Sequence, residues 1–396
     1  MVNAKVKEIV NAISNEIIGF TQELVRTKSN TCKEKDAVLL IKNKMAELGY
    51  DKICEDDMGN VIGIMGEGKP YAMFDGHIDA VDVIDADQWE YGPYSGEIVD
   101  GKLYGRGSSD MKAGLVSAIY AGYVAKKAGI IPEGKSIWIS ASLMEEDYDG
   151  FATKYVLDNM PCFPEFVVCC EPTDSMKIAN GHRGRCLVEI TVKGIACHGS
   201  SPELGDNPIY KMSEIFQRVE KLNEDFYKMP KGHPSVAATS IYCKGASENA
   251  VPESATVVLD RRTAINETEE DVTKEMNELI KGLDKVTWRF RDFDGVSWKG
   301  KKFVFHNFLK GWELDESHPL IVKTKKLVKE VCNHDAEIFK FGGSTNATSS
   351  AGTYNIPSMV IGPGNLLTAH ARNEYCTVSD IPQACEIYAM LCSEEE

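Results

Sequence analysis

The sequence predicts an α/β protein in which a smaller α+β domain is inserted into a larger, discontinuous domain. The chain has 396 residues, too many for one ordinary hydrophobic core. Strand-like and helix-like patterns alternate from residue 61 to residue 170, as they do in βαβ folds. Near residue 182 the order becomes strand, helix, strand, strand, helix, strand, which is typical of a split βαβ domain. We therefore expect the larger domain at residues 1–181 and 297–396 and the inserted domain at residues 182–296.

The elements of the larger domain are predicted from the spacing of its apolar residues. Residues 1–26 carry apolar side chains at helical spacing interrupted by charges, which indicates an amphipathic helix rather than a signal peptide. The sequence Asp100-Gly101 between two short β-rich runs predicts a hairpin. The other expected helices are 33–48, 111–127, 151–159 and 319–331, and the expected strands are 61–65, 71–74, 137–142, 166–168 and 356–361.

The inserted domain begins with an alternating pattern at residues 185–192, as expected of a half-buried strand. Its remaining elements are predicted as a helix at 208–222, strands at 237–242 and 255–260, a helix at 268–283 and a strand at 286–290.

Composition excludes several classes of protein. The hydrophobic content of 43% and charged content of 26% are those of a globular protein, and the formal charge of −16 argues against binding to nucleic acid or anionic membranes. No apolar run approaches the roughly 20 residues needed to span a bilayer. The 12 cysteines are scattered without a Cys-x-x-Cys pair. We therefore expect reduced thiols and a cytoplasmic location.

Chemically reactive side chains gather where the predicted strands of the larger domain end. Such strand ends carry the chemistry of α/β folds, and imidazole and carboxylate are ligands that Zn²⁺ accepts. A metal-bound histidine usually donates its second ring N–H to a carboxylate, and the i, i+2 spacing lets Asp79 serve His77 in this way. Asp110 stands where the helix at 111–127 is expected to begin, and we choose it as the carboxylate shared by two cations. Further candidates are Glu145, Glu146, Glu171 and His370.

Together these residues and the short sequences around them make the family recognisable. The chain resembles the co-catalytic zinc peptidases and amidohydrolases that include succinyl-diaminopimelate desuccinylases, acetylornithine deacetylases, aminoacylases, glutamate carboxypeptidases and carnosinases. A resemblance to the selenium-metabolism-linked hydrolases within this group would favour a ureido substrate. The matching strings, in chain order, are Gly76-His77-Ile78-Asp79, residues 105–114, Glu145-Glu146, residues 170–173 and Ala369-His370.

The resemblance implies a zinc-exopeptidase-like catalytic domain with a mixed sheet and an inserted ferredoxin-like lid and dimerisation domain. It implies that Asp110 bridges two divalent metal ions, Zn²⁺ first, with Co²⁺ or Mn²⁺ as alternatives. His77 and Glu171 would complete one site, and Glu146 and His370 the other. Glu145 would be the general base, Asp79 would orient His77, and the peptide bond after Asp110 would be cis.

Other strings resemble the family's substrate side. His198 would stabilise the oxyanion, generally in the active site of a second subunit, so a homodimer formed through the lid domain is expected. Asn249 and Arg262 would hold the substrate carboxylate, because the planar guanidinium of arginine binds carboxylates bidentately. Gly343 and Ser344 belong to a Gly-rich loop that approaches the substrate. Ser344 departs from the family's commoner Gly-Gly-Thr form, which leaves the acyl preference open.

We therefore predict a hydrolase that cleaves an amide C–N bond next to a free carboxylate, with Glu145 taking a proton from a metal-activated water. The first candidate substrate is an N-acyl or N-carbamoyl amino acid, and the alternative is a dipeptide or short peptide. Both require the same metals and carboxylate contacts. A non-catalytic metal-binding protein would be expected to have lost the base or a ligand, and this chain has kept both.

Overall fold

The computed structural model describes residues 2–174 and 176–394, which form two compact units. The first unit comprises Met1–His182, Gly295–Phe303 and Glu313–Glu396, and the second comprises Arg183–Asp294 and Val304–Trp312. The sequence instead predicts residues 304–312 in the larger domain and residues 182, 295 and 296 in the smaller one. Residues 308–309 belong to the second unit because the short strand β17 (Phe308–Leu309) pairs with a strand of that unit, β9 (Gly184–Lys193).

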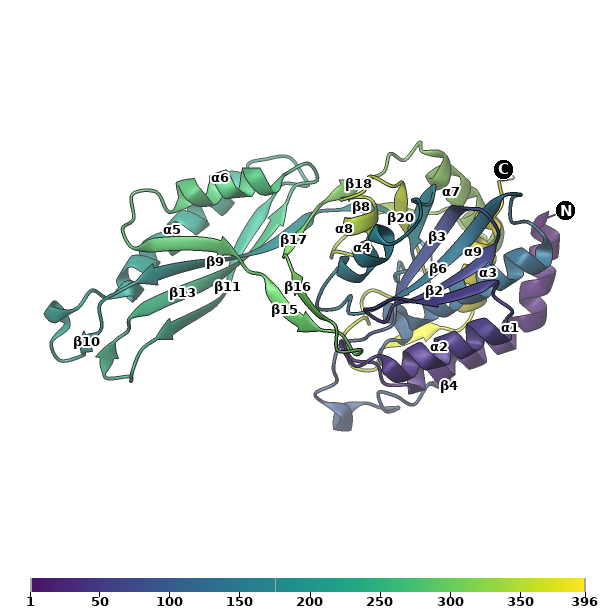
Figure 1. The fold of residues 1–396 in the computed structure, drawn as a ribbon, viewed down its shortest axis with the longest axis horizontal. Coiled ribbons are helices and arrows are strands. Elements are labelled where there is room, and N and C mark those ends of the chain that lie inside the picture. Colours follow the sequence, from purple (N-terminus) through teal and green to yellow (C-terminus); the bar gives the residue numbers. More distant parts are fainter. Residues whose placement is uncertain (1, 175, 395–396) are drawn as a thin grey trace. The chain divides into compact units, whose positions relative to one another are not determined.

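A mixed sheet forms the centre of the first unit (Figure 1). Strand β3 lies between β6 and β7 and is parallel to both, while β2 joins β6 in antiparallel register. In sheet order, the described strands on the main path are β1 (Lys52–Glu55), β2 (Val61–Gly66), β6 (Lys135–Ser142), β3 (Lys69–His77), β7 (Phe166–Cys169), β20 (Ser358–Val360), β8 (Ile178–His182) and β18 (Trp312–Glu313), and β19 (Ile338–Phe341) pairs with β8.

Helices cover both faces of this sheet. Helix α3 (Ala113–Ala128) packs on β3 and contacts α1 (Val2–Arg26) and α9 (Asp380–Leu391), and Figure 1 shows α4 (Phe151–Asp158) and α8 (Ala347–Ser350) on the opposite face. Buried side chains such as Phe74, Leu115 and Tyr388 fill the space between α3, α9 and the sheet. The other described helices of the unit are α2 (Lys35–Glu47) and α7 (Pro319–Cys332).

One local feature agrees with the sequence. The predicted hairpin joins β4 (Glu97–Val99) to β5 (Lys102–Tyr104), and both turn residues have positive φ, at 48° for Asp100 and 74° for Gly101. Strand β21 (Tyr375–Thr377) pairs with β5 on its other side. The pairing of β5 with β21 brings the segment that precedes Asp110 next to the segment that follows His370.

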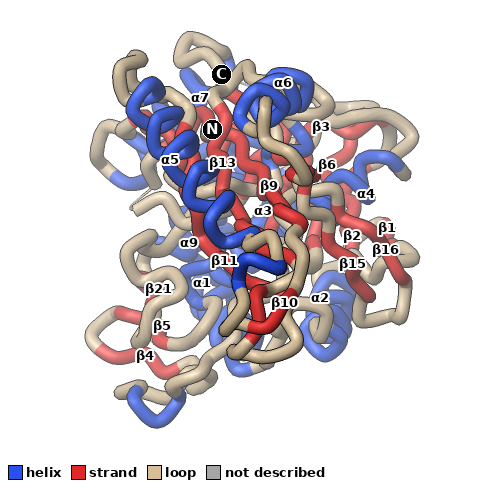
Figure 2. Tube along the Cα trace, turned by 90° about the vertical axis from the view of Figure 1, so that its left-hand side faces the viewer, coloured by secondary structure: helices blue, strands red, loops and turns tan. Residues whose placement is uncertain are grey.

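The second unit has the expected split βαβ arrangement. Its antiparallel sheet has the order β11 (Ser235–Lys244), β13 (Ser254–Thr263), β9 and β14 (Val286–Phe290). Helix α5 (Pro208–Phe226) lies across β11 and β13, as Figure 2 shows, and contacts α6 (Glu269–Leu279). Asn207 caps α5 through the N–H of Ile209, and Thr268 begins α6 in a capping box with Asp271. The remaining short strands described for the chain are β10 (Cys197–His198), β12 (Ala250–Val251), β15 (Phe293–Val296) and β16 (Lys302–Phe305).

Several predicted boundaries move. The helix expected from residue 111 begins at Ala113, because the backbone of Asp110 and Met111 is not helical. The helix expected at 268–283 ends at Leu279, and that at 208–222 continues to Phe226. Beyond the predicted elements, the structure adds several others, among them strands β1, β8, β19 and β21 and helices α8 and α9.

Candidate metal centre

The candidate ligands meet at one edge of the first unit's sheet. His77 is the last residue of β3, Glu145 and Glu146 follow β6, and Glu171 follows β7. Because β3, β6 and β7 are parallel neighbours, their carboxyl ends meet at the same edge. This is the position expected from the sequence.

Asp110 lies between the two imidazoles. Its Oδ1 is 3.0 Å from Nε2 of His77, and its Oδ2 is 3.3 Å from Nε2 of His370. Nε2 of His370 is also 2.9 Å from Oε2 of Glu146, and Nε2 of His77 is 3.7 Å from Oε2 of Glu171. Each oxygen of Asp110 therefore faces a different histidine, as a carboxylate shared between two cations must.

The donor set fits a pair of divalent metal ions. Ligand atoms of His77, Asp110 and Glu146 lie within 4.8 Å of one another, and so do those of His77, Glu145 and Glu171. Four carboxyl groups share this small region with only two imidazoles. Burying so many acids close together is costly unless cations balance them.

The acids perturb one another's proton affinity. Burial, followed by the Asp110 carboxylate, raises the pKa of Glu146 to about 7, and burial is also the main reason that the pKa of Glu171 rises to about 7. Burial and the neighbouring Asp149 hold the pKa of Glu145 well above its ordinary value. Burial opposes the ionisation of Asp110, but hydrogen bonds from His370 and His77 outweigh it and keep this pKa far below its usual range. Adding cations would reverse the rise at the three glutamates.

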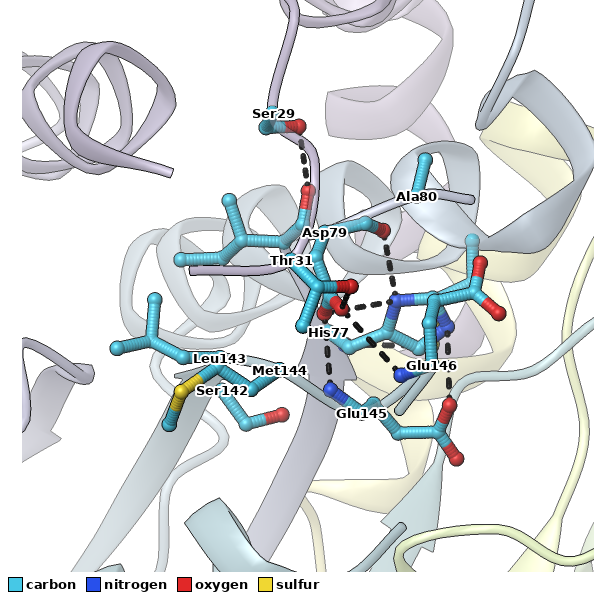
Figure 3. Close-up of polar contacts among 12 residues, drawn as sticks. Ser29, Thr31, His77, Asp79, Ala80, Ser142, Leu143, Met144, Glu145 and Glu146 are labelled. Atoms are coloured by element: carbon cyan, nitrogen blue, oxygen red, sulfur yellow. Dashed lines mark hydrogen bonds and ion pairs between the residues drawn. The ribbon is translucent and has the colours of Figure 1, made fainter. Parts of the chain in front are cut away.

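Asp79 makes a different contact from the one expected. Nδ1 of His77 lies 2.9 Å from the backbone carbonyl oxygen of Asp79 and 3.6 Å from its carboxylate. The carboxylate instead accepts the backbone N–H of Glu145 at 3.0 Å, the N–H of Glu146 at 3.3 Å and the hydroxyl of Thr31 at 2.8 Å (Figure 3). The main chain of Asp79 thus holds the imidazole, and its side chain holds the segment that carries the two glutamates.

Asp110 also differs from the expectation, since it does not begin a helix. Its backbone has φ −115° and ψ 96°, and α3 starts three residues later. The following peptide bond, Asp110–Met111, is cis, as the resemblance implied.

The Gly-rich loop lies in the same unit as the metal centre. The hydroxyl of Ser344 donates to the carboxylate of Asp149, and the side-chain oxygen of Asn346 accepts the N–H of Gly150 at 2.9 Å. Both partners belong to the turn that follows Glu145 and Glu146. A β-carbon added at the neighbouring Gly343 would come no closer than 3.6 Å to the ring of Phe341, which is an ordinary van der Waals contact.

The remaining predicted residues belong to the second unit. The pairing of β10 with β12 sets His198 opposite Ala250 and thus beside Asn249, whose carbonyl oxygen accepts the N–H of Gly199 at 2.6 Å. Arg262 is partly exposed and its Nε lies 2.8 Å from Oδ1 of Asp260. Arg261, by contrast, has a fully buried side chain that pairs with two glutamates, Glu267 and Glu275. Of the two adjacent arginines, only Arg262 is accessible to a ligand.

Four supporting residues were not singled out from the sequence: Thr31, Glu34, Arg106 and Glu374. Glu34 is buried and accepts the N–H of Met144 at 3.2 Å, next to Glu145. Arg106 lies within the string recognised for Asp110, residues 105–114, and Glu374 stands four residues after His370, but neither position indicated a role.

Comparisons with known proteins identify the family of this chain. The profile of "Peptidase family M20/M25/M40" matches residues 73–394. The chain belongs to this family. It is 33% identical over 375 residues to the uncharacterized protein YgeY of Escherichia coli (strain K12), covering 94% of this chain and 92% of YgeY. It is 27% identical over 391 residues to a succinyl-diaminopimelate desuccinylase of Pseudoalteromonas atlantica, covering 95% and 98% of the two chains.

Among solved structures, the fold is similar to the metallo-carboxypeptidase Sso-CP2 of Sulfolobus solfataricus. The TM-score is 0.75 at 16% identity, over 95% of this chain and 98% of that one. These findings confirm the predicted family and the α/β fold with a separate antiparallel domain. They also confirm the prediction that the protein is an enzyme acting on C–N bonds.

Two further observations concern the chain as a whole. Within residues 2–394 apart from 175, no helix has both the length and the apolar character needed to cross a membrane. All twelve cysteines are free. The cytoplasmic location stays a prediction.

Proposed function

We propose that this protein hydrolyses the amide bond of an N-acyl or N-carbamoyl amino acid, using two divalent metal ions and Glu145 as general base. The observation that carries the proposal is the position of Asp110, with one oxygen toward His77 and the other toward His370. Glu145 stands beside this arrangement, 3.9 Å from Nε2 of His77, and its side chain is 9% exposed.

In this proposal His77 and Glu171 would hold one ion, Glu146 and His370 would hold the other, and Asp110 would contribute to both. Zn²⁺ is the first choice for such nitrogen and oxygen ligands, with Co²⁺ or Mn²⁺ as alternatives. When bound, the ions would polarise the substrate carbonyl and acidify water. Glu145 would take a proton from water as the water oxygen bonds to the carbonyl carbon, and would pass this proton to the nitrogen as the C–N bond breaks.

The second unit is proposed to supply the substrate contacts and to serve as lid and dimerisation domain. Arg262, oriented by Asp260, would bind the substrate carboxylate together with Asn249. His198, whose Nδ1 is 2.7 Å from the hydroxyl of Ser200, would donate from its other nitrogen to the developing oxyanion, in the active site of a second subunit. Gly343 and Ser344 would approach the acyl side of the substrate.

The alternative is a dipeptidase or carboxypeptidase acting on a short peptide. The similarity to a desuccinylase supports the first substrate class, and the fold similarity to a metallo-carboxypeptidase supports the second. Both classes require the same base and metals. Comparing rates on N-acetyl, N-succinyl and N-carbamoyl amino acids with rates on dipeptides distinguishes them.

Replacing the proposed base tests the mechanism. Glu145→Gln keeps the size of the side chain but removes its basicity, so the variant should bind two zinc ions and hydrolyse its substrate at least about 100-fold more slowly. Metal content by mass spectrometry and initial rates on the best substrate of the panel provide the measurement. Near wild-type turnover by this variant would reject Glu145 as the base. A wild-type protein that binds zinc but hydrolyses no amide of the panel would reject the function.

A further inference from the structure

A buried ion pair stands behind the metal centre. Nη1 of Arg106 lies 2.6 Å from Oε2 of Glu374, and the two side chains are only 5% and 0% exposed. The pair joins residues that are 268 positions apart in the sequence. Charged groups are rarely buried this completely unless they are paired and hydrogen-bonded, so the remaining contacts of both side chains indicate what the pair holds in place.

Glu374 holds the chain that carries Asp110. Its second oxygen, Oε1, accepts the backbone N–H of Ser109 at 2.9 Å and the N–H of Asp110 at 3.0 Å. With Arg106 on the other oxygen, one carboxylate thus binds three donors. Two adjacent N–H groups on a single oxygen fix the direction of the main chain at Asp110, and so the direction in which its side chain leaves.

Arg106 holds the chain that carries His370. Its Nη2 donates to the carbonyl oxygen of His370 at 3.2 Å, while its backbone N–H donates to Pro93 at 2.7 Å. His370 has φ +62°, a left-handed conformation that costs a non-glycine residue free energy and needs support from its surroundings. The ring of Trp89 lies 5.2 Å from the guanidinium carbon and covers one side of it. Arg106 therefore cannot turn away from this carbonyl without losing several contacts.

We infer that Arg106 and Glu374 are positioning residues that set the separation between Asp110 and His370. They thereby set the affinity for the ion proposed to be bound by Asp110, Glu146 and His370. This inference rests on the proposed two-metal function. His77 and Glu171 are carried by β3 and by the end of β7, to which the hydrogen bonds of this pair do not extend. Asp110 is proposed to contribute to both ions, whereas His370 contributes to only one, so disturbing the pair should weaken the binding of that ion more than the binding of the other.

Two conservative variants separate the contacts. Glu374→Gln keeps an oxygen for the N–H groups of Ser109 and Asp110 but presents an NH₂ group to Arg106. Arg106→Lys keeps a positive charge for Glu374, but a single ammonium cannot reproduce the planar fork that spans Glu374 and the His370 carbonyl. Arg261→Met is the matched control, because it breaks a buried arginine–glutamate pair in the second unit.

The measurement is zinc binding to metal-free protein, in competition with a chromophoric chelator. Wild-type protein should bind two ions. Both test variants should bind the first ion within about threefold of wild type and the second at least about 10-fold more weakly, as is usual when groups that orient metal ligands are changed. The control should bind both ions as wild type does. The double variant Arg106→Gln with Glu374→Gln leaves no unpaired buried charge, and replaces any single variant that melts below the assay temperature.

The outcomes are distinct. If the test variants bind both ions with wild-type affinity, the inference is overturned and the proposed function stands. The same holds if Arg261→Met weakens binding of the second ion as much as the test variants do, because the effect would then be general. Weakening of both ions to the same extent also overturns it. A wild-type protein that binds fewer than two zinc ions refutes the proposed function and this inference together.

Discussion

Asp79→Asn should weaken metal binding without releasing the imidazole of His77. All three partners of the Asp79 carboxylate are donors: the hydroxyl of Thr31 and the N–H groups of Glu145 and Glu146. An asparagine offers only one oxygen, and its NH₂ group must face donors on the other side. The hydroxyl of Thr31 can rotate and accept, but a backbone N–H cannot, so the N–H of Glu146 is left without a partner.

The magnitude follows from this count. One buried N–H without an acceptor costs about 1–3 kcal/mol of the free energy of unfolding. The carboxylate accepts the N–H of the proposed ligand Glu146 and the N–H of the preceding residue, so metal affinity should fall by about 10- to 100-fold, as for other groups that orient ligands. The imidazole should keep its orientation, because Nδ1 of His77 faces the backbone carbonyl of residue 79, which the substitution does not change.

Three measurements test this reasoning. Thermal unfolding of metal-free protein reports the stability, zinc competition reports the affinity, and the Nδ1–H resonance of His77 in NMR spectra reports whether the ring is still held. Thr31→Val is a useful control, since it removes one donor and leaves both N–H groups with their acceptor. We assign the imidazole contact to the main chain of Asp79 and support of the glutamate segment to its side chain. Unchanged zinc affinity in Asp79→Asn, or loss of the His77 resonance with affinity intact, would refute this assignment.

Three further predictions concern residues around the centre. Burial, followed by the charge of Asp79, raises the pKa of Glu34 from 4.5 to about 8. Metal-free wild-type protein should therefore lose stability as pH rises through this range. The melting temperature of Glu34→Gln should exceed that of wild type by an amount that grows from about pH 5 to about pH 9. A melting difference independent of pH would contradict this. Gly114→Ala would place its Cβ 2.0 Å from the carbonyl oxygen of Cys170. We therefore expect the free energy of unfolding, measured by chemical denaturation, to fall by about 1–3 kcal/mol, and zinc binding to weaken through the adjacent Glu171. Wild-type values in both measurements would disprove the contact. Arg261→Met should cost about 3 kcal/mol by leaving two partly exposed glutamates unpaired, with zinc affinity unchanged, and a stability equal to wild type would show that the pair contributes nothing.

The parts of the centre that were predictable from the sequence are those that end recognisable strands. His77, Glu145 and Glu171 each follow a short run of β-forming residues, and parallel pairing then brings them together. The Asp100-Gly101 hairpin was equally predictable, because it depends on residues only a few positions apart.

The unpredicted parts depend on contacts that are distant in the sequence. Arg106 lies in a recognised string and Glu374 stands four residues after His370, but nothing local reveals that this guanidinium will meet a carboxylate 268 residues away. The i, i+2 spacing of His77 and Asp79 was correctly interpreted as a contact, yet the spacing does not reveal whether the backbone or the side chain makes it. Likewise the helical pattern from residue 111 gave no sign of the non-helical backbone at Asp110.

The order of elements along the chain has a consequence for synthesis on the ribosome. The second unit is assembled almost entirely from a continuous segment, Arg183–Asp294, whereas the sheet of the first unit stays incomplete until β20 enters between β7 and β8, and α9 is made later still. A nascent polypeptide must therefore keep the apolar faces of β7 and α3 exposed while the intervening segment is translated. We expect chaperones to bind such intermediates, and a stop codon placed before residue 358 to yield aggregation of the first unit beside a folded second one.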